Sequence, residues 1–213
     1  MENISILTTD AEVAELAGQL AAETAIAVDL EAFHSVLAEM SGGELDAPAP
    51  IRIFVFRDDT TFAPYSIRSG VRPAVVGGYF LSRPDGGVIA INAGTEQDPS
   101  EIAFHEYVHA VTAKNRPALP VWLSEGLASF YESVQIRGST AVIGRPLQHH
   151  LTELANGLPM PMEEMLLVDR ESPVADETAR PSAWFHWSEV RSAIPTEGAE
   201  VILRGSSEVW DYD

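Results

Sequence analysis

The 213-residue chain contains no cysteine, and it has only 13 Lys and Arg residues against 32 Asp and Glu residues. Without thiols it can form no disulfide bond, no cysteine nucleophile and no zinc or iron–sulfur site that depends on Cys ligands. The resulting formal net charge of −19 argues against nucleic acids and anionic membrane surfaces as partners, because both require a basic footprint.

Long apolar segments and a basic N-terminal segment are also missing. No uncharged run approaches the roughly 18–20 residues of a membrane-spanning helix, so the sequence predicts no transmembrane segment. The first basic residue is Arg52, whereas a secretory signal places basic residues before its apolar core. Unless a leader has been removed, we therefore expect a cytoplasmic protein, of an oligomeric state that the sequence leaves open.

Hydrophobic residues make up 46% of the sequence, which is enough for the core of a single domain of this length. We divide this domain, residues 1–213, into an acidic helical segment (1–50), a core (51–168) and a C-terminal region of unassigned structure (169–213). The negative charge is concentrated in the two ends, and residues 52–160 hold ten acids and nine bases. The charge is therefore expected to influence solubility more than substrate choice.

Helical patterns occupy much of the chain. Residues 9–40 show the periodicity of a helix with one buried stripe. The stripe consists of Phe33, Val36, Leu37 and Met40. Asp98 can cap a second helix that ends near residues 115–117, and further helices are expected from Pro120 and from about Pro146.

Strand patterns lie between the first two helices. Residues 51–56 (IRIFVF) predict a buried strand, and residues 78–81 and 88–92 predict two more. The turn residues at 83–87 (RPDGG) favour a β-hairpin between the last two strands. Because the strands precede most of the helices, the sequence predicts an α+β fold with a small sheet.

An H-E-x-x-H motif lies within the second predicted helix, where residues 105–109 read HEYVH. Residues four apart share a helix face, so His105 and His109 present two imidazoles to one point. Neutral imidazole is a good ligand for Zn2+, and a bound zinc ion lowers the pKa of a coordinated water to about 7. Glu106 lies next to this point and can take the proton of that water and deliver it to a leaving amine.

A catalytic zinc site usually has three protein ligands. The pattern H-E-x-x-H-x-x-G-x-x-H is excluded, because Thr112 and Asn115 stand where it requires Gly and His. Glu125 lies 16 residues after His109 on the next predicted helix, and a helix–turn–helix return can bring it to the metal. Glu132 is the alternative third ligand; otherwise it is a partner of a ligand histidine or a solvated charge.

The two motifs together resemble a known family. HEYVH followed by LPVWLSEGLASFYE at residues 119–132 is similar to the gluzincin branch of zinc metallopeptidases. The match is closest to poorly characterised bacterial peptidase-MA-like proteins with HEYxH and then WLxEGLA, and it extends loosely over residues 51–168. It implies a zincin-like fold, in which a small mixed sheet packs on the motif helix and a mainly helical part follows.

The resemblance also implies the roles of individual residues. His105, His109 and Glu125 would bind zinc, and Glu106 would be the general base. In zincins the edge strand before the metal helix pairs with extended peptide substrates, and the resemblance assigns this role to residues 88–92.

Several other polar residues have alternative roles. Ser129, four residues after Glu125, could orient a ligand histidine. His149 and His150 are adjacent and so should not face one point on a helix; one could line the cleft, but surface positions are the simpler expectation. His34 is expected to be structural.

Peptide hydrolysis also needs a donor for the developing oxyanion. Gluzincins usually supply Tyr or His from a later helix, and residues 183–187 (AWFHW) offer His186 for this role or, alternatively, form an aromatic core cluster. Pro195, Gly198 and Gly205 interrupt the long helix expected after this segment. The C-terminal region therefore departs from the family pattern.

These observations predict a zinc-dependent metallopeptidase that acts on peptide or protein substrates. The alternative from another class is a zinc-binding, catalytically weak domain that binds peptides or a partner protein. Intact Glu106 favours the enzyme, and the irregular C-terminal region favours the binding domain. A metal-free helical protein, whose motif histidines serve only as hydrogen-bonding groups, is the third interpretation.

Overall fold

The structure is a computed structural model of the whole chain. It describes residues 4–7, 13–43, 45–46, 48, 50–66, 68–69, 72–73, 77–156, 161–168 and 199–202. His186 lies outside the described residues. Within these residues, no helix combines the length and hydropathy that crossing a bilayer requires.

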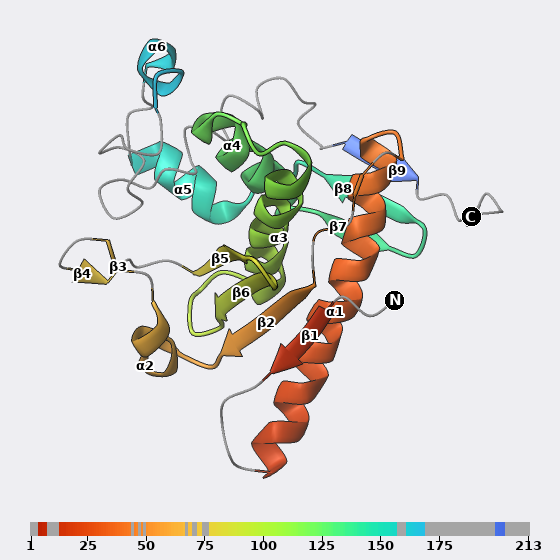
Figure 1. Cartoon of the computed structure of the whole chain (residues 1–213), viewed down its shortest axis with the longest axis vertical. Coiled ribbons are helices and arrows are strands. Elements are labelled where there is room, and N and C mark those ends of the chain that lie inside the picture. Colours follow the sequence, from red (N-terminus) through yellow and green to blue (C-terminus); the bar gives the residue numbers. More distant parts are fainter. Residues whose placement is uncertain are drawn as a thin grey trace.

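Four strands form the main sheet, in the order β1-β2-β6-β5 (Figure 1). They are β1 (Ile4–Leu7), β2 (Ile51–Phe56), β5 (Gly78–Arg83) and β6 (Gly86–Asn92). The strands β1, β2 and β6 are parallel, whereas β5 runs antiparallel to β6. The three strands expected from the sequence and the hairpin are thus confirmed, and the fold is a mixture of helices and small sheets of the α+β kind.

The assignment of residues 88–92 to the sheet edge is wrong. These residues belong to β6, which pairs with β2 on one side and with β5 on the other. Within the described part of the chain, β5 is the edge strand next to β6. Burial explains the order, because Ile89, Ala90 and Ile91 are almost fully buried, whereas residues 81–83 of β5 are exposed.

The hairpin between β5 and β6 has the tight turn that its sequence predicts. Arg83 pairs with Gly86, so only Pro84 and Asp85 form the loop. Gly86 has a φ of 141°, and a side chain at this position would collide with the carbonyl of Pro50. The turn therefore requires glycine at this position.

Two long helices build the core beside this sheet. Helix α3 (Pro99–Asn115) contacts β5 and β6, and helix α1 (Val13–Met40) contacts α3. Phe33 of α1 stacks on Phe104 of α3 with ring centroids 4.5 Å apart. The other stripe residues Val36 and Leu37 are buried as expected, but Met40 is 43% exposed because it is the last residue of α1.

Local capping determines where α3 begins. The Asp98 side chain accepts a hydrogen bond from the backbone N–H of Ser100, and Pro99 occupies the first turn, where its missing N–H costs nothing. The helix ends at Asn115, and α4 (Val121–Tyr131) begins directly after Pro120. The short connection returns α4 against α3, and the two helices contact each other.

The remaining elements are short. They are α2 (Asp59–Phe62), a 3-10 turn (Ala63–Tyr65), β3 (Arg68–Ser69), β4 (Arg72–Pro73), β7 (Gln135–Arg137), β8 (Thr140–Ile143), α5 (Gln148–Asn156), α6 (Met162–Met165) and β9 (Ala199–Ile202). The strands β7, β8 and β9 form an antiparallel sheet after α4. Within the described residues, the part of the chain after α3 therefore contains a small sheet that the sequence did not predict, because strands of three or four residues are too short to show a clear periodicity.

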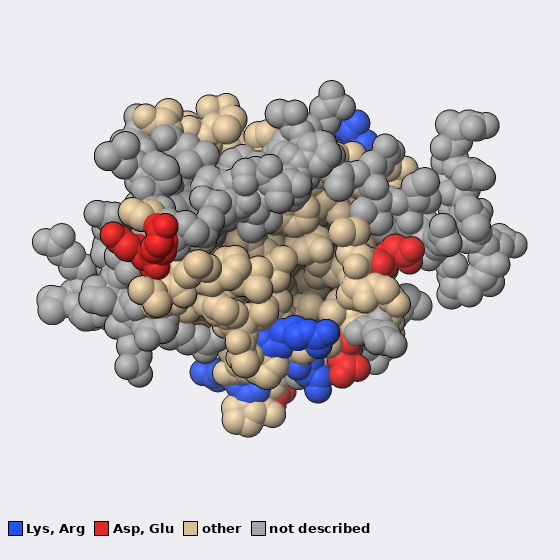
Figure 2. Space-filling view, turned by 90° about the horizontal axis from the view of Figure 1, so that it is seen from above, with Lys and Arg blue, Asp and Glu red and all other residues tan. Residues whose placement is uncertain are grey.

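The charged side chains are unevenly distributed on the surface. Figure 2 shows the face seen from above Figure 1, where uncharged side chains cover most of the coloured area and surround a hollow. Lys and Arg gather along one margin, and Asp and Glu occur in small separate groups.

The close contact between β5 and α3 can be tested at Gly78. A Cβ atom at this position would lie 2.5 Å from Cγ2 of Ile102 and 2.7 Å from the carbonyl oxygen of Ala90. We expect Gly78→Ala to lower the free energy of unfolding by about 1–3 kcal/mol, as overpacking usually does. Ser82→Ala, at an exposed position of the same strand, should change it by less than about 0.5 kcal/mol. Urea denaturation would measure both, and equal stabilities would contradict this packing.

Candidate metal centre

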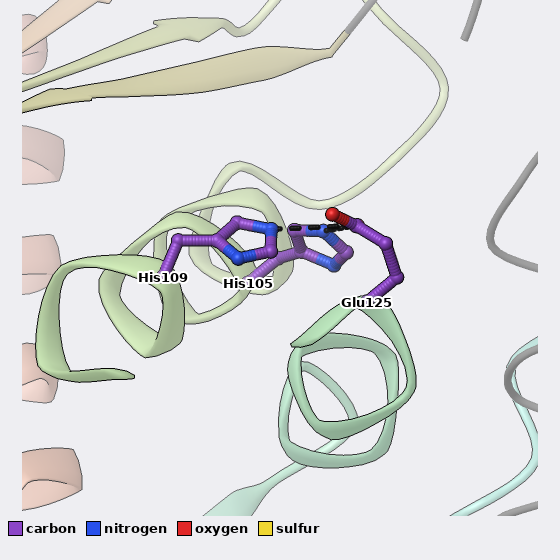
Figure 3. A group of neighbouring side chains, drawn as sticks. All are labelled: His105, His109 and Glu125. Atoms are coloured by element: carbon purple, nitrogen blue, oxygen red, sulfur yellow. Dashed lines mark ion pairs between the residues drawn. The ribbon is translucent and has the colours of Figure 1, made fainter. Parts of the chain in front are cut away.

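His105 and His109 lie one turn apart on α3 and point toward Glu125 of α4 (Figure 3). The Nε2 atom of His105 is 3.5 Å from Oε2 of Glu125, and the Nε2 atom of His109 is 3.4 Å from the same oxygen. The structure therefore brings together the three residues that the sequence predicted as ligands, and this group could hold a metal ion. We call it the first group.

The geometry of the first group fits zinc. Ligand atoms bound at about 2.0–2.1 Å in a tetrahedron are roughly 3.3–3.4 Å apart, which matches the two nitrogen–oxygen distances. Two imidazoles and one carboxylate are also a donor set found in catalytic zinc sites. The three side chains are 15–19% exposed, so an ion and a small ligand can reach them from solvent.

Both histidines are oriented by hydrogen bonds at Nδ1. Glu132 places Oε2 2.6 Å from Nδ1 of His105, and Ser124 places Oγ 3.2 Å from Nδ1 of His109. A carboxylate can only accept here, so His105 donates from Nδ1 and keeps the lone pair of Nε2 directed at the first group. Glu132 is thus placed as a partner of a ligand histidine and not as the third ligand.

Glu132 also contacts two histidines of α5. The Nε2 atom of His150 forms a short hydrogen bond with Oε1 of Glu132, and Nε2 of His149 lies 3.5 Å from the same oxygen. His150 is 1% exposed. The expectation of a surface position is therefore wrong for His150, whereas the His149 side chain is 37% exposed. Both residues lie in the first turn of α5, where their long side chains can turn toward one group.

The structure also corrects the role of Ser129. Its side chain is completely buried, and its hydroxyl has no hydrogen-bond partner among the described residues. The helix places Glu132, and not Ser129, beside His105. Sequence reasoning missed Ser124, although its position directly before Glu125 in the second motif was a usable signal.

The charges of the first group stabilise one another. Burial alone would lower the pKa of both histidines, but Glu125 raises the pKa of His109, and Glu125 with Glu132 raises that of His105 well above its usual range. Burial alone would raise the pKa of Glu125, but His109 and His105 lower it far below the usual range. The donors therefore attract one another and are held together before any ion binds.

Glu106 lies next to both the first group and β5. Burial raises the pKa of its carboxyl group, while the charges of His105 and His109 and a hydrogen bond from the backbone N–H of Phe80 act in the opposite direction. Its Cγ atom is 3.6 Å from the point where Gly78 would carry a Cβ. The edge strand β5 and the carboxylate of Glu106 therefore lie next to each other at one side of the first group.

No family model matches the chain, and no curated protein matches it. His186, the residue expected to stabilise an oxyanion, is outside the described residues. The first group, Glu106 and β5 are the features of the described residues that bear on function.

The orienting role of Glu132 makes a first prediction for this site. Glu132→Gln should weaken zinc binding about 10- to 100-fold, because the ring of His105 loses its carboxylate acceptor. Ser129→Ala, one turn earlier on the same helix, should leave the zinc affinity unchanged. Competition with a chromophoric chelator would measure both dissociation constants. An unchanged affinity in Glu132→Gln would show that this contact does not orient the ligand.

The raised pKa values of His105 and His109 make a second prediction. The metal-free protein should keep protons on these rings near neutral pH, and zinc must displace them because it binds neutral imidazole. Zinc affinity should therefore increase as the pH rises from 6 to 8, with release of protons. Calorimetry in buffers of different ionisation enthalpy would count them. An affinity independent of pH would contradict histidine ligation.

Proposed function

We propose that this protein is a zinc-dependent metallopeptidase of the gluzincin type, with a zincin-like domain. His105, His109 and Glu125 hold the zinc ion, and Glu106 is the general base. The observation that carries this proposal is the convergence of two Nε2 atoms and one carboxylate oxygen at tetrahedral spacing, with a further carboxylate beside them. All four residues lie within residues 51–168, the segment proposed as the catalytic core.

Each protein group has a defined task in this reaction. When bound, a zinc ion would polarise the scissile carbonyl and lower the pKa of a coordinated water molecule, so that the water can lose a proton and become a nucleophile. Glu106 accepts the proton of the attacking water on its carboxylate and passes it to the nitrogen of the leaving amine. Burial favours the protonated form of Glu106, which suits a group that must hold a proton between two transfers.

We assign substrate alignment to β5 instead of residues 88–92. An extended peptide can add to the free edge of a sheet through main-chain hydrogen bonds. Among the described strands, β5 is the edge next to β6, and its residues Gly78 and Phe80 adjoin Glu106. A peptide paired along β5 would therefore pass beside the general base.

The alternative of a zinc-binding but catalytically weak domain uses the same metal site. The position of Glu106 favours turnover, because simple peptide binding does not need a half-buried carboxylate next to the metal donors. The charges of His105 and His109 and the hydrogen bond from Phe80 stabilise the charged form of this carboxylate, which is the form that a general base needs. The two functions differ in whether zinc-loaded protein cleaves peptides.

Hydrolysis of a mixed peptide library, followed by mass spectrometry, tests this proposal. Zinc-loaded wild-type protein should cleave peptides, and a chelator should stop it. Glu106→Gln should lower the rate at least about 100-fold while it keeps its zinc, because only the proton transfer is lost. Glu163→Gln, an exposed position on α6, should retain full activity.

Two results would contradict the proposal. Full activity in zinc-loaded Glu106→Gln would exclude Glu106 as the base. A wild-type protein that binds zinc and peptides but cleaves nothing would instead support the binding domain.

A further inference from the structure

A second set of metal-binding groups lies behind the first group. Glu132, His149 and His150 each offer one ligand atom, and these atoms lie within 4.8 Å of one another. Glu132 is 3% exposed, His150 is 1% exposed and His149 is 37% exposed. The set is therefore mostly buried but open to solvent on the side of His149. We call it the second group.

The arrangement of the two histidines is unusual for consecutive residues of a helix. Side chains at neighbouring positions leave a helix about 100° apart. His149 and His150 nevertheless direct their Nε2 atoms at the same oxygen of Glu132, and their ring centroids are 4.1 Å apart. Two imidazole nitrogens and a carboxylate oxygen at one point are a donor set for a transition metal.

Carboxylates and cationic groups, among them Arg145, lie together around the second group. Glu101 lies one turn before His105 on α3, and burial together with the charge of Glu132 raises its pKa, while His149 lowers it. Two carboxylates and two imidazoles thus influence one another in a largely buried region. A divalent cation would relieve the repulsion between the carboxylates.

We propose that Glu132, His149 and His150 bind a second divalent metal ion, and that zinc is the ion best suited to these donors. Glu132 coordinates this ion through Oε1 and keeps Oε2 on Nδ1 of His105. His150 coordinates through Nε2 and therefore carries its proton on Nδ1. The ring of His105 separates the two sites, because its Nε2 faces the first group and its Nδ1 faces Glu132.

This ion would have a structural role. Glu132 follows the last residue of α4, and the two histidines lie in the first turn of α5, so coordination ties these helices together. The ion also fixes the carboxylate that orients His105. The second site goes beyond the proposed peptidase activity, and it stands whether or not the chain cleaves peptides.

Zinc counting on the full chain tests the second site. Metal-stripped protein is loaded with ZnCl2, dialysed against a weak chelator and measured by elemental analysis and native mass spectrometry. Wild-type protein should retain two zinc ions. Glu125→Ala, which removes a donor of the first group only, should retain one, and so should His149→Asn. The variant with both substitutions should retain none.

Matched controls separate site loss from misfolding. His149 is the most exposed member of the second group, so His149→Asn leaves no large buried cavity. His34→Asn removes a histidine that contacts Tyr107 and belongs to neither group, and it should retain two ions. Circular dichroism would confirm that each variant is folded.

The proposal is overturned if wild-type protein retains one zinc ion and Glu125→Ala retains none. It is also overturned if folded His149→Asn still retains two. In either case the second group would bind no metal ion and would only orient His105 through the hydrogen bond from its ring to Glu132. Failure of the proposed function would be seen differently, as protein with its full zinc content and no peptide cleavage.

Discussion

The buried carboxylate of Glu132 lies between α3, α4 and α5. It is hydrogen-bonded to His105 through one oxygen and to His150 through the other. An uncompensated charge at this depth would cost several kcal/mol, so these contacts are a condition for the packing of the three helices. They also fix the ring of His105, and thereby the direction of its Nε2 atom. Removal of the carboxylate would thus disturb a metal donor and the attachment of α5 at the same time.

The second constraint is the close approach of β5 to α3. Only a glycine fits at position 78, where Ile102 and the carbonyl of Ala90 leave no room for a side chain. This contact brings the backbone of the edge strand to Glu106, which accepts a hydrogen bond from Phe80. The group proposed to move protons and the strand proposed to align peptides are therefore parts of one packed unit, and their relative position does not depend on a mobile loop.

Local patterns in the sequence were sufficient for the elements that carry the site. The capping residue Asp98, the H-E-x-x-H motif and the turn at residues 83–87 predicted α3, its histidine pair and the hairpin. Such patterns contain no information about which side of a hairpin joins the rest of a sheet, and the resemblance to zincins placed residues 88–92 at the edge, where the structure has β5. The convergence of His149 and His150 was also missed, because helical spacing describes where side chains start and not where long side chains end. Glu125 could be predicted as a ligand because the connection between the two helices is short and because the second motif resembles that of gluzincins.

The central claim is that His105, His109 and Glu125 hold zinc beside Glu106. The most direct measurement is the anomalous difference density at the zinc absorption edge in crystals of zinc-loaded protein. We expect a peak about 2.0–2.2 Å from Nε2 of both histidines and from a carboxylate oxygen of Glu125, with Glu106 near the remaining coordination position and not bound to the ion. The absence of a peak between these three residues, or a zinc ion coordinated directly by Glu106, would contradict the claim.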